Sequence, residues 1–241
     1  MRIYGLVGKK LDHSFSKDFF SKKFKKEHII NTKYVNIQLD NLLNIHKVIK
    51  DLNISGFNVT LPYKQEIIPY LYKIDKEAEM VGSVNVVKLL DNKLYGFNTD
   101  IIGFEKSISP LIKYRKTALI LGNGGVSKSV QYVLSKLNIS FKVVNRNTRF
   151  DYSDINQEII NSSDIIVNCT PVGSFPRIDT SPSIPYDNIT SKHLLFDLIY
   201  NPELTKFLSH GLQKDAIIKN GKEMLYIQAE ESWSIWNSDN I

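Results

Sequence analysis

One short stretch, residues 117–126, constrains the fold of this chain more than any other. An apolar run, TALIL, leads directly into the glycine-rich turn GNGG and then into a segment with the hydrophobic spacing of a helix. A strand that turns on glycines and opens a helix is typical of parallel α/β sheets. The stretch therefore predicts a βα unit at the start of such a sheet.

The spacing of the small residues in this turn indicates a ligand. Gly122, Gly124 and Ser127 occupy the three positions of the pattern G-x-G-x-x-G/A. The first glycine permits the tight turn, the second lets backbone amides approach a pyrophosphate, and a small third residue lets the helix pack on the strand. The helix N-terminus adds partial positive charge. We predict a dinucleotide-binding turn, with a purely structural turn as the alternative.

The end of the next expected strand indicates which dinucleotide binds. NAD-binding proteins usually place Asp or Glu about 20 residues after the glycines, where it binds the ribose 2′-hydroxyl. This chain instead has Asn145, Arg146 and, three residues later, Arg149. Guanidinium groups bind a phosphate through bidentate, charge-assisted hydrogen bonds. The sequence therefore favours NADP over NAD.

Hydrophobic periodicity predicts strand–helix alternation along the rest of the chain, and hence an α/β fold. Strands are expected at residues 3–7, 34–37, 54–59, 84–90, 93–97, 117–121, 141–144, 164–168, 194–198 and 216–218. Helices are expected at residues 17–28, 41–52, 65–71, 100–112, 126–137 and 223–236. Asp91-Asn92 reads as a two-residue hairpin turn. Residues 170–190 are rich in Pro, Ser and Asp, which is typical of a loop.

Composition argues against several classes of protein. The net charge is +6, but it comes from 26 lysines spread along the chain and only 5 arginines, so it does not favour a nucleic-acid partner. No apolar run approaches the roughly 20 residues of a membrane-spanning helix. Cys169 is the single cysteine, which excludes an internal disulfide and argues against a cysteine-based metal site. We expect a cytoplasmic protein without a bound metal.

Several polar residues follow or precede expected strands, and each has a structural reading beside a functional one. Ser14 and Ser16 could cap a helix or bind a carboxylate. Lys64, in FNVTLPYK, could be a surface charge or an amine placed at a site. Asp100 could cap the connecting helix, and Gln228 could be a satisfied residue of the last helix.

Taken together, the short motifs of this chain closely resemble those of the shikimate dehydrogenase family, in order and along nearly the whole sequence. The matching stretches are HSFS, NVTLPYK, the VN of residues 84–85, GFNTD, GNGG, NRNT, NCTPVG, DLIYNPELT and GKEMLYIQA. Each motif is short, but nine in sequence are hard to obtain by chance.

The resemblance implies a role for each matching residue. Lys64 and Asp100 would form the catalytic pair. The substrate would be bound by Ser14, Ser16, Thr60, Asn85, Tyr200 and Gln228. NADP would be bound by Gly122, Asn123, Gly124, Gly125, Asn145, Arg146, Arg149, Thr170 and Gly221.

The resemblance also implies an architecture and an activity. We expect an N-terminal α/β substrate domain with a mixed sheet (residues 1–101 plus 220–241), a Rossmann-like NADP-binding domain (residues 102–219), and a catalytic cleft between them. The expected reaction is the reversible, NADPH-dependent reduction of 3-dehydroshikimate to shikimate, in a monomer or homodimer without nucleic-acid or membrane partners.

Two alternative functions share the same expected fold. One is a quinate/shikimate dehydrogenase of broader specificity, often NAD-dependent, against which the two arginines argue. The other is a catalytically silent NADP-binding regulator, which loss of Lys64 or Asp100 would have indicated, yet both residues are present. A methylenetetrahydrofolate dehydrogenase is disfavoured by the NTD and MLYIQA stretches.

Overall fold

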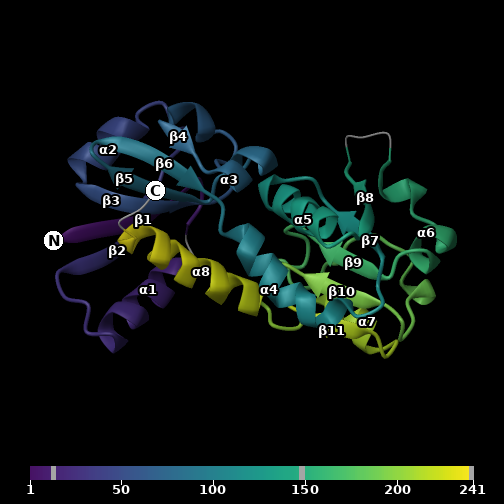
Figure 1. Cartoon of the computed structure of the whole chain (residues 1–241). Helices are drawn as coiled ribbons and strands as arrows, with labels where there is room; N and C mark the ends of the chain where they lie inside the picture. Colours follow the sequence, from purple (N-terminus) through teal and green to yellow (C-terminus); the bar gives the residue numbers. More distant parts are fainter. Residues whose placement is uncertain (12–14, 147–149, 239–241) are drawn as a thin grey trace. The chain divides into compact units, whose positions relative to one another are not determined.

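The computed structural model describes residues 1–11, 15–146 and 150–238 (Figure 1). Ser14 and Arg149, two of the predicted site residues, lie outside the described residues. The chain divides into two compact units. The first contains residues 1–99 and 228–241, and the second contains residues 100–227.

The first unit is built on a six-stranded mixed sheet with the order β2-β1-β3-β5-β6-β4. Its strands are β1 (Arg2–Gly8), β2 (Thr32–Gln38), β3 (Ile54–Val59), β4 (Lys73–Ile74), β5 (Val86–Leu90) and β6 (Lys93–Phe97). β1 runs parallel to β2 and β3, whereas β5 is antiparallel to both β3 and β6. The β5–β6 hairpin turns at Asp91-Asn92, where both φ angles are positive, as the sequence predicts for such a turn.

Helices cover both faces of this sheet and bury two separate cores. On one face, α1 (Phe15–Lys26) and α8 (Lys222–Asn237) pack an aromatic cluster that includes Phe20 and Trp236. On the other face, α2 (Ile45–Asp51) and α3 (Lys76–Val81) cover an aliphatic core around Phe57. Because side chains alternate along a strand, neighbouring residues of β3 face different cores.

The second unit is a parallel sheet of five strands with the order β11-β10-β9-β7-β8. Its strands are β7 (Thr117–Leu121), β8 (Ser140–Val144), β9 (Ile165–Asn168), β10 (Leu194–Asp197) and β11 (Ile217–Lys219). The chain moves from β7 outward to β8 and then returns to β9 on the other side of β7. This reversal is a topological switch point, and in open α/β sheets ligands bind at the carboxyl ends of the strands there.

Helices lie on both faces of the second sheet as well, which gives the doubly wound arrangement expected of a Rossmann-like domain. The helices of this unit are α4 (Asp100–Ile112), α5 (Gly125–Lys136), α6 (Gln157–Asn161) and α7 (Lys206–Leu212). Phe104 of α4 packs edge-to-face on Phe196 of β10, with ring centroids 5.1 Å apart. Phe207 of α7 belongs to the core of the opposite face. The predicted fold class, a mixed sheet followed by a parallel nucleotide-binding sheet, is confirmed.

Two helix predictions are wrong in detail. Residues 65–71 do not form an α-helix, but a series of turns that ends in the 3₁₀ helix Ile68–Tyr70. Pro69 has no backbone N–H, and the Ile68 N–H already bonds to the carbonyl of Gln65 in a 3₁₀ turn. The helix predicted from residue 41 begins only at Ile45.

In the described part of the chain, the sequence did not predict the short elements β4, α3, α6 and α7, nor the 3₁₀ helices Tyr152–Asp154 and Tyr186–Asn188. Among the described residues, no helix is long and apolar enough to cross a bilayer.

Candidate active site

The topology of the first sheet brings several predicted site residues to one edge. Thr60 directly follows β3. Because β5 is antiparallel to β3, the residue before β5, Asn85, lies beside the end of β3, and its carbonyl accepts a hydrogen bond from the Val59 N–H (2.9 Å). β6 then returns to this edge and delivers Thr99 there. Three motifs that are far apart in sequence therefore converge because of strand direction alone.

Lys64 belongs to the same edge. It lies in the turn that follows β3 and is half-buried. Its backbone carbonyl accepts a hydrogen bond from the Val84 N–H (2.7 Å), which attaches the turn to the segment that leads to Asn85. The next segment along, residues 97–99, is attached in turn by Asn98, whose side-chain amide donates to the Ser83 carbonyl (2.7 Å). Lys64 is thus held by the backbone at a strand end rather than on an exposed helix.

Asn85 organises the polar groups of this edge. It is 2% exposed, and its side-chain oxygen accepts a hydrogen bond from the backbone N–H of Thr99 (2.7 Å). Its side-chain amide donates to the Thr99 hydroxyl (3.1 Å) and to the side-chain oxygen of Gln228 on α8 (3.3 Å). The structure therefore joins two predicted substrate-binding residues directly, although they are 143 positions apart in sequence. Thr99 was not predicted, but it precedes the predicted Asp100.

Three further residues that were predicted to bind substrate or to act in catalysis, Ser16, Thr60 and Asp100, differ in burial and in contacts. Ser16 is half-buried in the first turn of α1 and hydrogen-bonds to the hydroxyl of Tyr34. Thr60 is half-buried, and its methyl group packs against Gly8, where an added Cβ would lie 2.6 Å from Thr60 Cγ2. Asp100 is the first residue of α4 and is 4% exposed, a position at which a carboxylate is favoured by the helix N-terminus.

The glycine turn of the second unit leaves the N-terminus of α5 open, as the prediction of a dinucleotide-binding turn requires. Gly122 has a φ of +100°, and a Cβ there would lie 2.9 Å from Cγ2 of Thr170, so the turn needs glycine. Gly124 is the N-cap of α5 and offers no side-chain cap to the helix amides. A Cβ at Gly124 would have no heavy atom within 4 Å, which means that the space beside the helix N-terminus is open. These features fit a bound dinucleotide phosphate.

The third position of the G-x-G-x-x-G/A pattern packs as the sequence predicts. Ser127 is fully buried, and its hydroxyl donates to the Gly122 carbonyl (2.7 Å), so it locks the helix to the turn. Gly125 is buried, whereas Asn123 is exposed and accepts a hydrogen bond from the side chain of Gln131 (3.3 Å). Asn145 and the exposed Arg146 follow β8, the strand paired with β7.

Thr170 lies at the switch point, directly beyond β9. Its backbone N–H and its hydroxyl both donate to the side-chain oxygen of Asn168 (3.0 and 2.7 Å). The Asn168 amide donates in turn to the carboxylate of Asp197 at the end of β10 (3.1 Å). Asn168 and Asp197 are fully buried, and neither was among the predicted site residues, although both lie in the motifs NCTPVG and DLIYNPELT. A polar residue at the end of an apolar strand is the signal that could have found them.

Asp197 is the most perturbed carboxyl group near this edge. Burial raises its pKa to about 6, although hydrogen bonds from the Thr205 hydroxyl (2.6 Å), the Ile199 N–H (3.0 Å) and Asn168 oppose the shift. Burial also raises the pKa of the Cys169 thiol far above its usual range, so this cysteine stays protonated and unreactive at neutral pH.

The two remaining predicted residues follow the last strands of this sheet. Tyr200 is half-buried beyond β10, and burial raises the pKa of its hydroxyl. Gly221 follows β11 and packs against backbone: its N–H donates to the Ile199 carbonyl (3.0 Å), and a Cβ there would lie 2.1 Å from the carbonyl oxygen of Leu198. Only glycine fits at this position.

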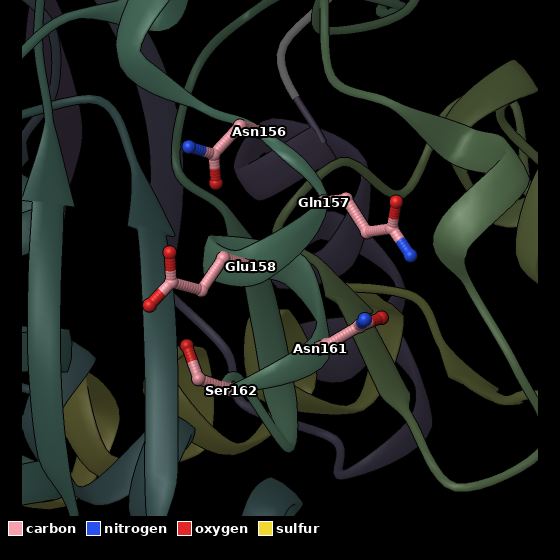
Figure 2. Close-up of a pocket in the computed structure, with 5 residues that line it drawn as sticks. All are labelled: Asn156, Gln157, Glu158, Asn161 and Ser162. Carbon is pink, nitrogen blue, oxygen red and sulfur yellow. The ribbon is translucent and has the colours of Figure 1, made fainter.

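A separate surface hollow lies at α6, and it does not involve these residues. Figure 2 shows the five side chains that line it, Asn156, Gln157, Glu158, Asn161 and Ser162. All five are exposed, and Asn156 and Ser162 bond to the backbone at the ends of α6. We assign no ligand to this hollow. Within the described part of the chain, no cluster of three or more His, Cys, Asp or Glu residues could hold a metal ion.

Comparisons with known proteins agree with this picture. The family model described as the shikimate dehydrogenase substrate binding domain matches residues 6–87. A shikimate dehydrogenase (NADP(+)) from Clostridium beijerinckii is 37% identical and covers 100% of this chain and 94% of its own length.

Solved structures of the family are similar as well. The crystal structure of shikimate dehydrogenase from Aquifex aeolicus superposes with a TM-score of 0.89 at 32% identity, over 100% of this chain and 94% of the other. Another shikimate dehydrogenase, crystallised with NADP+, gives a TM-score of 0.88 at 32% identity, over 98% of this chain and 90% of the other. Because the likeness extends over the whole chain at more than 30% identity, this chain belongs to the shikimate dehydrogenase family.

Proposed function

We propose that this protein is an NADP-dependent shikimate dehydrogenase, an oxidoreductase that reversibly reduces 3-dehydroshikimate to shikimate on the route to chorismate and the aromatic amino acids. The observation that carries the proposal is the convergence of Thr60, Lys64, Asn85 and Gln228 at one edge of the first sheet. These residues stand in the family's motifs, in a chain that matches family members over its full length.

The proposed mechanism assigns charge and proton handling to this chain's own residues. When bound, NADPH supplies the hydride that is added to the carbonyl carbon of the substrate. Negative charge then develops on the carbonyl oxygen, which needs a cationic hydrogen-bond donor and finally a proton. Lys64 supplies the ammonium group and that proton, and Asp100 is its catalytic partner. In the reverse direction the same groups receive the proton from the hydroxyl of shikimate.

Substrate recognition is assigned to the polar groups of the first unit. Ser14 and Ser16 would bind the carboxylate, to which Tyr200 adds a hydroxyl. Thr60, Asn85 and Gln228 would bind the ring hydroxyls. The hydrogen bonds among Asn85, Thr99 and Gln228 support this assignment, because they fix the orientation of the side chains before a substrate arrives.

NADP binding is assigned to the switch-point edge of the second sheet. Gly122, Asn123, Gly124 and Gly125 would hold the pyrophosphate at the N-terminus of α5. Asn145, Arg146 and Arg149 would bind the adenosine end, where guanidinium groups suit a 2′-phosphate. Thr170 and Gly221 would line the rest of the cofactor. The open space beside Gly124 supports this placement.

The finer organisation is part of the same proposal. Residues 1–101 with 220–241 would act as the substrate domain and residues 102–219 as the NADP domain. The active form would be a monomer or homodimer in the cytoplasm, with no nucleic-acid or membrane partner.

Oxidation of shikimate and of quinate, each with NADP+ and with NAD+, tests the proposal against its nearest alternative. We expect turnover of shikimate with NADP+ and little turnover of quinate. Comparable rates with quinate would assign the protein to the broader class, and NADP+ binding without turnover of either compound would indicate a silent regulator.

A further inference from the structure

A buried amide, Asn58, connects the polar groups of the substrate edge on the α1–α8 side of the first sheet. Asn58 lies in β3 and is 6% exposed. Its side-chain oxygen accepts a hydrogen bond from the hydroxyl of Tyr34 (2.8 Å). Its side-chain nitrogen donates to the Ser232 hydroxyl (3.0 Å) and to the Asn85 carbonyl (3.3 Å). Both the oxygen and the nitrogen of the Asn58 side chain are therefore hydrogen-bonded.

The two hydroxyls bonded to Asn58 each reach a predicted substrate-binding residue. Tyr34 is hydrogen-bonded to Ser16, and because burial raises the pKa of Tyr34 well above its usual range, its hydroxyl stays protonated and continues to donate to Asn58. Ser232 is fully buried, and its hydroxyl donates to the backbone carbonyl of Gln228, one turn earlier in α8 (2.7 Å). The connected residues come from α1, β2, β3, the start of β5 and α8.

We propose that Tyr34, Asn58 and Ser232 form a positioning network, which sets the orientation of Ser16, Asn85 and Gln228 for substrate binding. This inference rests on the proposed function, and it adds residues that need not touch the substrate. A buried polar network whose members are all bonded fixes one arrangement, because any other arrangement leaves a buried donor or acceptor unpaired.

The surroundings argue that this network has a purpose beyond packing. The face of the sheet on which it lies carries an apolar core rich in aromatic rings: Phe20 stacks on Tyr34 (4.5 Å between centroids) and Trp236 stacks on Tyr4 (4.7 Å). Apolar side chains at positions 34, 58 and 232 together would continue this core and leave none of these three side chains with an unpaired group. The polar group instead stands where the core borders the predicted substrate edge.

The test compares two network variants with two matched controls. Tyr34→Phe and Ser232→Ala each remove one hydroxyl from the network. Tyr4→Phe removes a hydroxyl that bonds to Arg2 in the same aromatic cluster, and Ser234→Ala alters an exposed serine of α8. Steady-state kinetics are measured with 3-dehydroshikimate and NADPH, and thermal unfolding is followed for each variant.

We expect each network variant to raise the KM for 3-dehydroshikimate about tenfold, with kcat and the KM for NADPH within about twofold of wild type. The controls should keep the wild-type KM even if their melting temperature falls. Both hydroxyls act through Asn58. The double variant Tyr34→Phe/Ser232→Ala should therefore raise the KM for 3-dehydroshikimate about as much as either single variant does, and not by the product of the two increases.

Three results would overturn the inference. Substrate KM values equal to those of the controls, in a wild type that turns over, would show a purely structural network and leave the proposed function intact. Losses that multiply in the double variant would show that the two hydroxyls act independently. A wild type that does not reduce 3-dehydroshikimate would remove the proposed function and this inference with it.

Discussion

The side-chain oxygen of Asn85 accepts a hydrogen bond from the backbone N–H of Thr99, at 2.7 Å, and both residues are almost fully buried. This bond fixes the last residue before Asp100 to the strand end that carries Thr60. One predicted substrate-binding side chain thereby determines where the chain leaves β6 toward the predicted catalytic acid.

Asn85→Ala should therefore impair both stability and activity. Without its acceptor the buried Thr99 N–H is unpaired, so the free energy of unfolding should fall by about 1–3 kcal/mol, and kcat/KM should fall more than about tenfold at a temperature where the variant is folded. Urea unfolding and initial rates measure the two effects. Asn36→Ala is the control, because the side chain of Asn36 also bonds to the backbone in this unit, by donating to the Leu11 carbonyl (3.0 Å). Equal loss of activity in both variants would contradict the assignment.

Lys64→Ala should reduce turnover far more than substrate affinity. The ammonium group is proposed to act on charge that develops in the transition state, so we expect kcat to fall by about 10²- to 10⁴-fold. The dissociation constant of shikimate, measured by calorimetry, should change much less. Lys47→Ala, an exposed lysine on α2, should behave as wild type. A variant that loses affinity and retains kcat would limit Lys64 to binding.

Gly124→Ala separates cofactor binding from folding. The added methyl group meets no protein atom within 4 Å, so the melting temperature should stay within about 1 °C of wild type. The same methyl group would occupy the space assigned to the pyrophosphate, so the dissociation constant of NADPH should rise about tenfold or more. Fluorescence titration with NADPH measures it.

Gly122→Ala is the matched comparison for this experiment. Its positive φ and its contact with Thr170 predict a loss of about 1–3 kcal/mol in stability. If Gly124→Ala binds NADPH as wild type does, the phosphate is not at this turn.

Asp197 predicts a defined pH dependence of stability. Its pKa is raised by burial from 3.8 to about 6 in the folded protein, so the folded state holds the proton more tightly than the unfolded state does. Its stabilising contribution is therefore full below about pH 4 and is lost as the pH rises through about 6. Relative to Asp197→Asn, which cannot titrate, the wild type should lose up to about 3 kcal/mol of unfolding free energy between pH 4 and pH 7.

Urea unfolding at several pH values measures this difference. Asp179→Asn, at an exposed loop position, is the control for removal of one carboxylate. A wild type that gains stability over Asp197→Asn as the pH rises would mean that the hydrogen bonds from Thr205, Ile199 and Asn168 outweigh burial.

Local patterns in the sequence were sufficient wherever one short segment contains the whole signal. The strand Thr117–Leu121, the turn at Gly122 and the packing role of Ser127 were all predicted, because a strand–turn–helix unit is encoded in adjacent residues. The short helices α3, α6 and α7 were missed because each spans two turns or less, which is too few residues for a helical period to emerge. At residues 65–71 the prediction gave a helix that is absent. The apolar residues around Pro69 suggested a helix that the backbone does not form.

Contacts between distant segments could not be predicted from the sequence. Asn58 and Ser232 are separated by 174 positions, and nothing near either residue indicates the other. The fold brings them together, because Asn58 lies near the end of β3 and α8, which carries Ser232, packs over the same face of the sheet. Asn85 and Gln228 were assigned to substrate binding only through the family resemblance, and their hydrogen bond is a result of the fold.

The most direct test of this account is to mix the purified protein with 3-dehydroshikimate and follow the absorbance of NADPH, with NADH in a parallel sample. We predict rapid oxidation of NADPH, formation of shikimate and little oxidation of NADH. Tight binding of NADPH without turnover would contradict the proposed enzyme and leave a protein of this family that binds the cofactor and catalyses nothing.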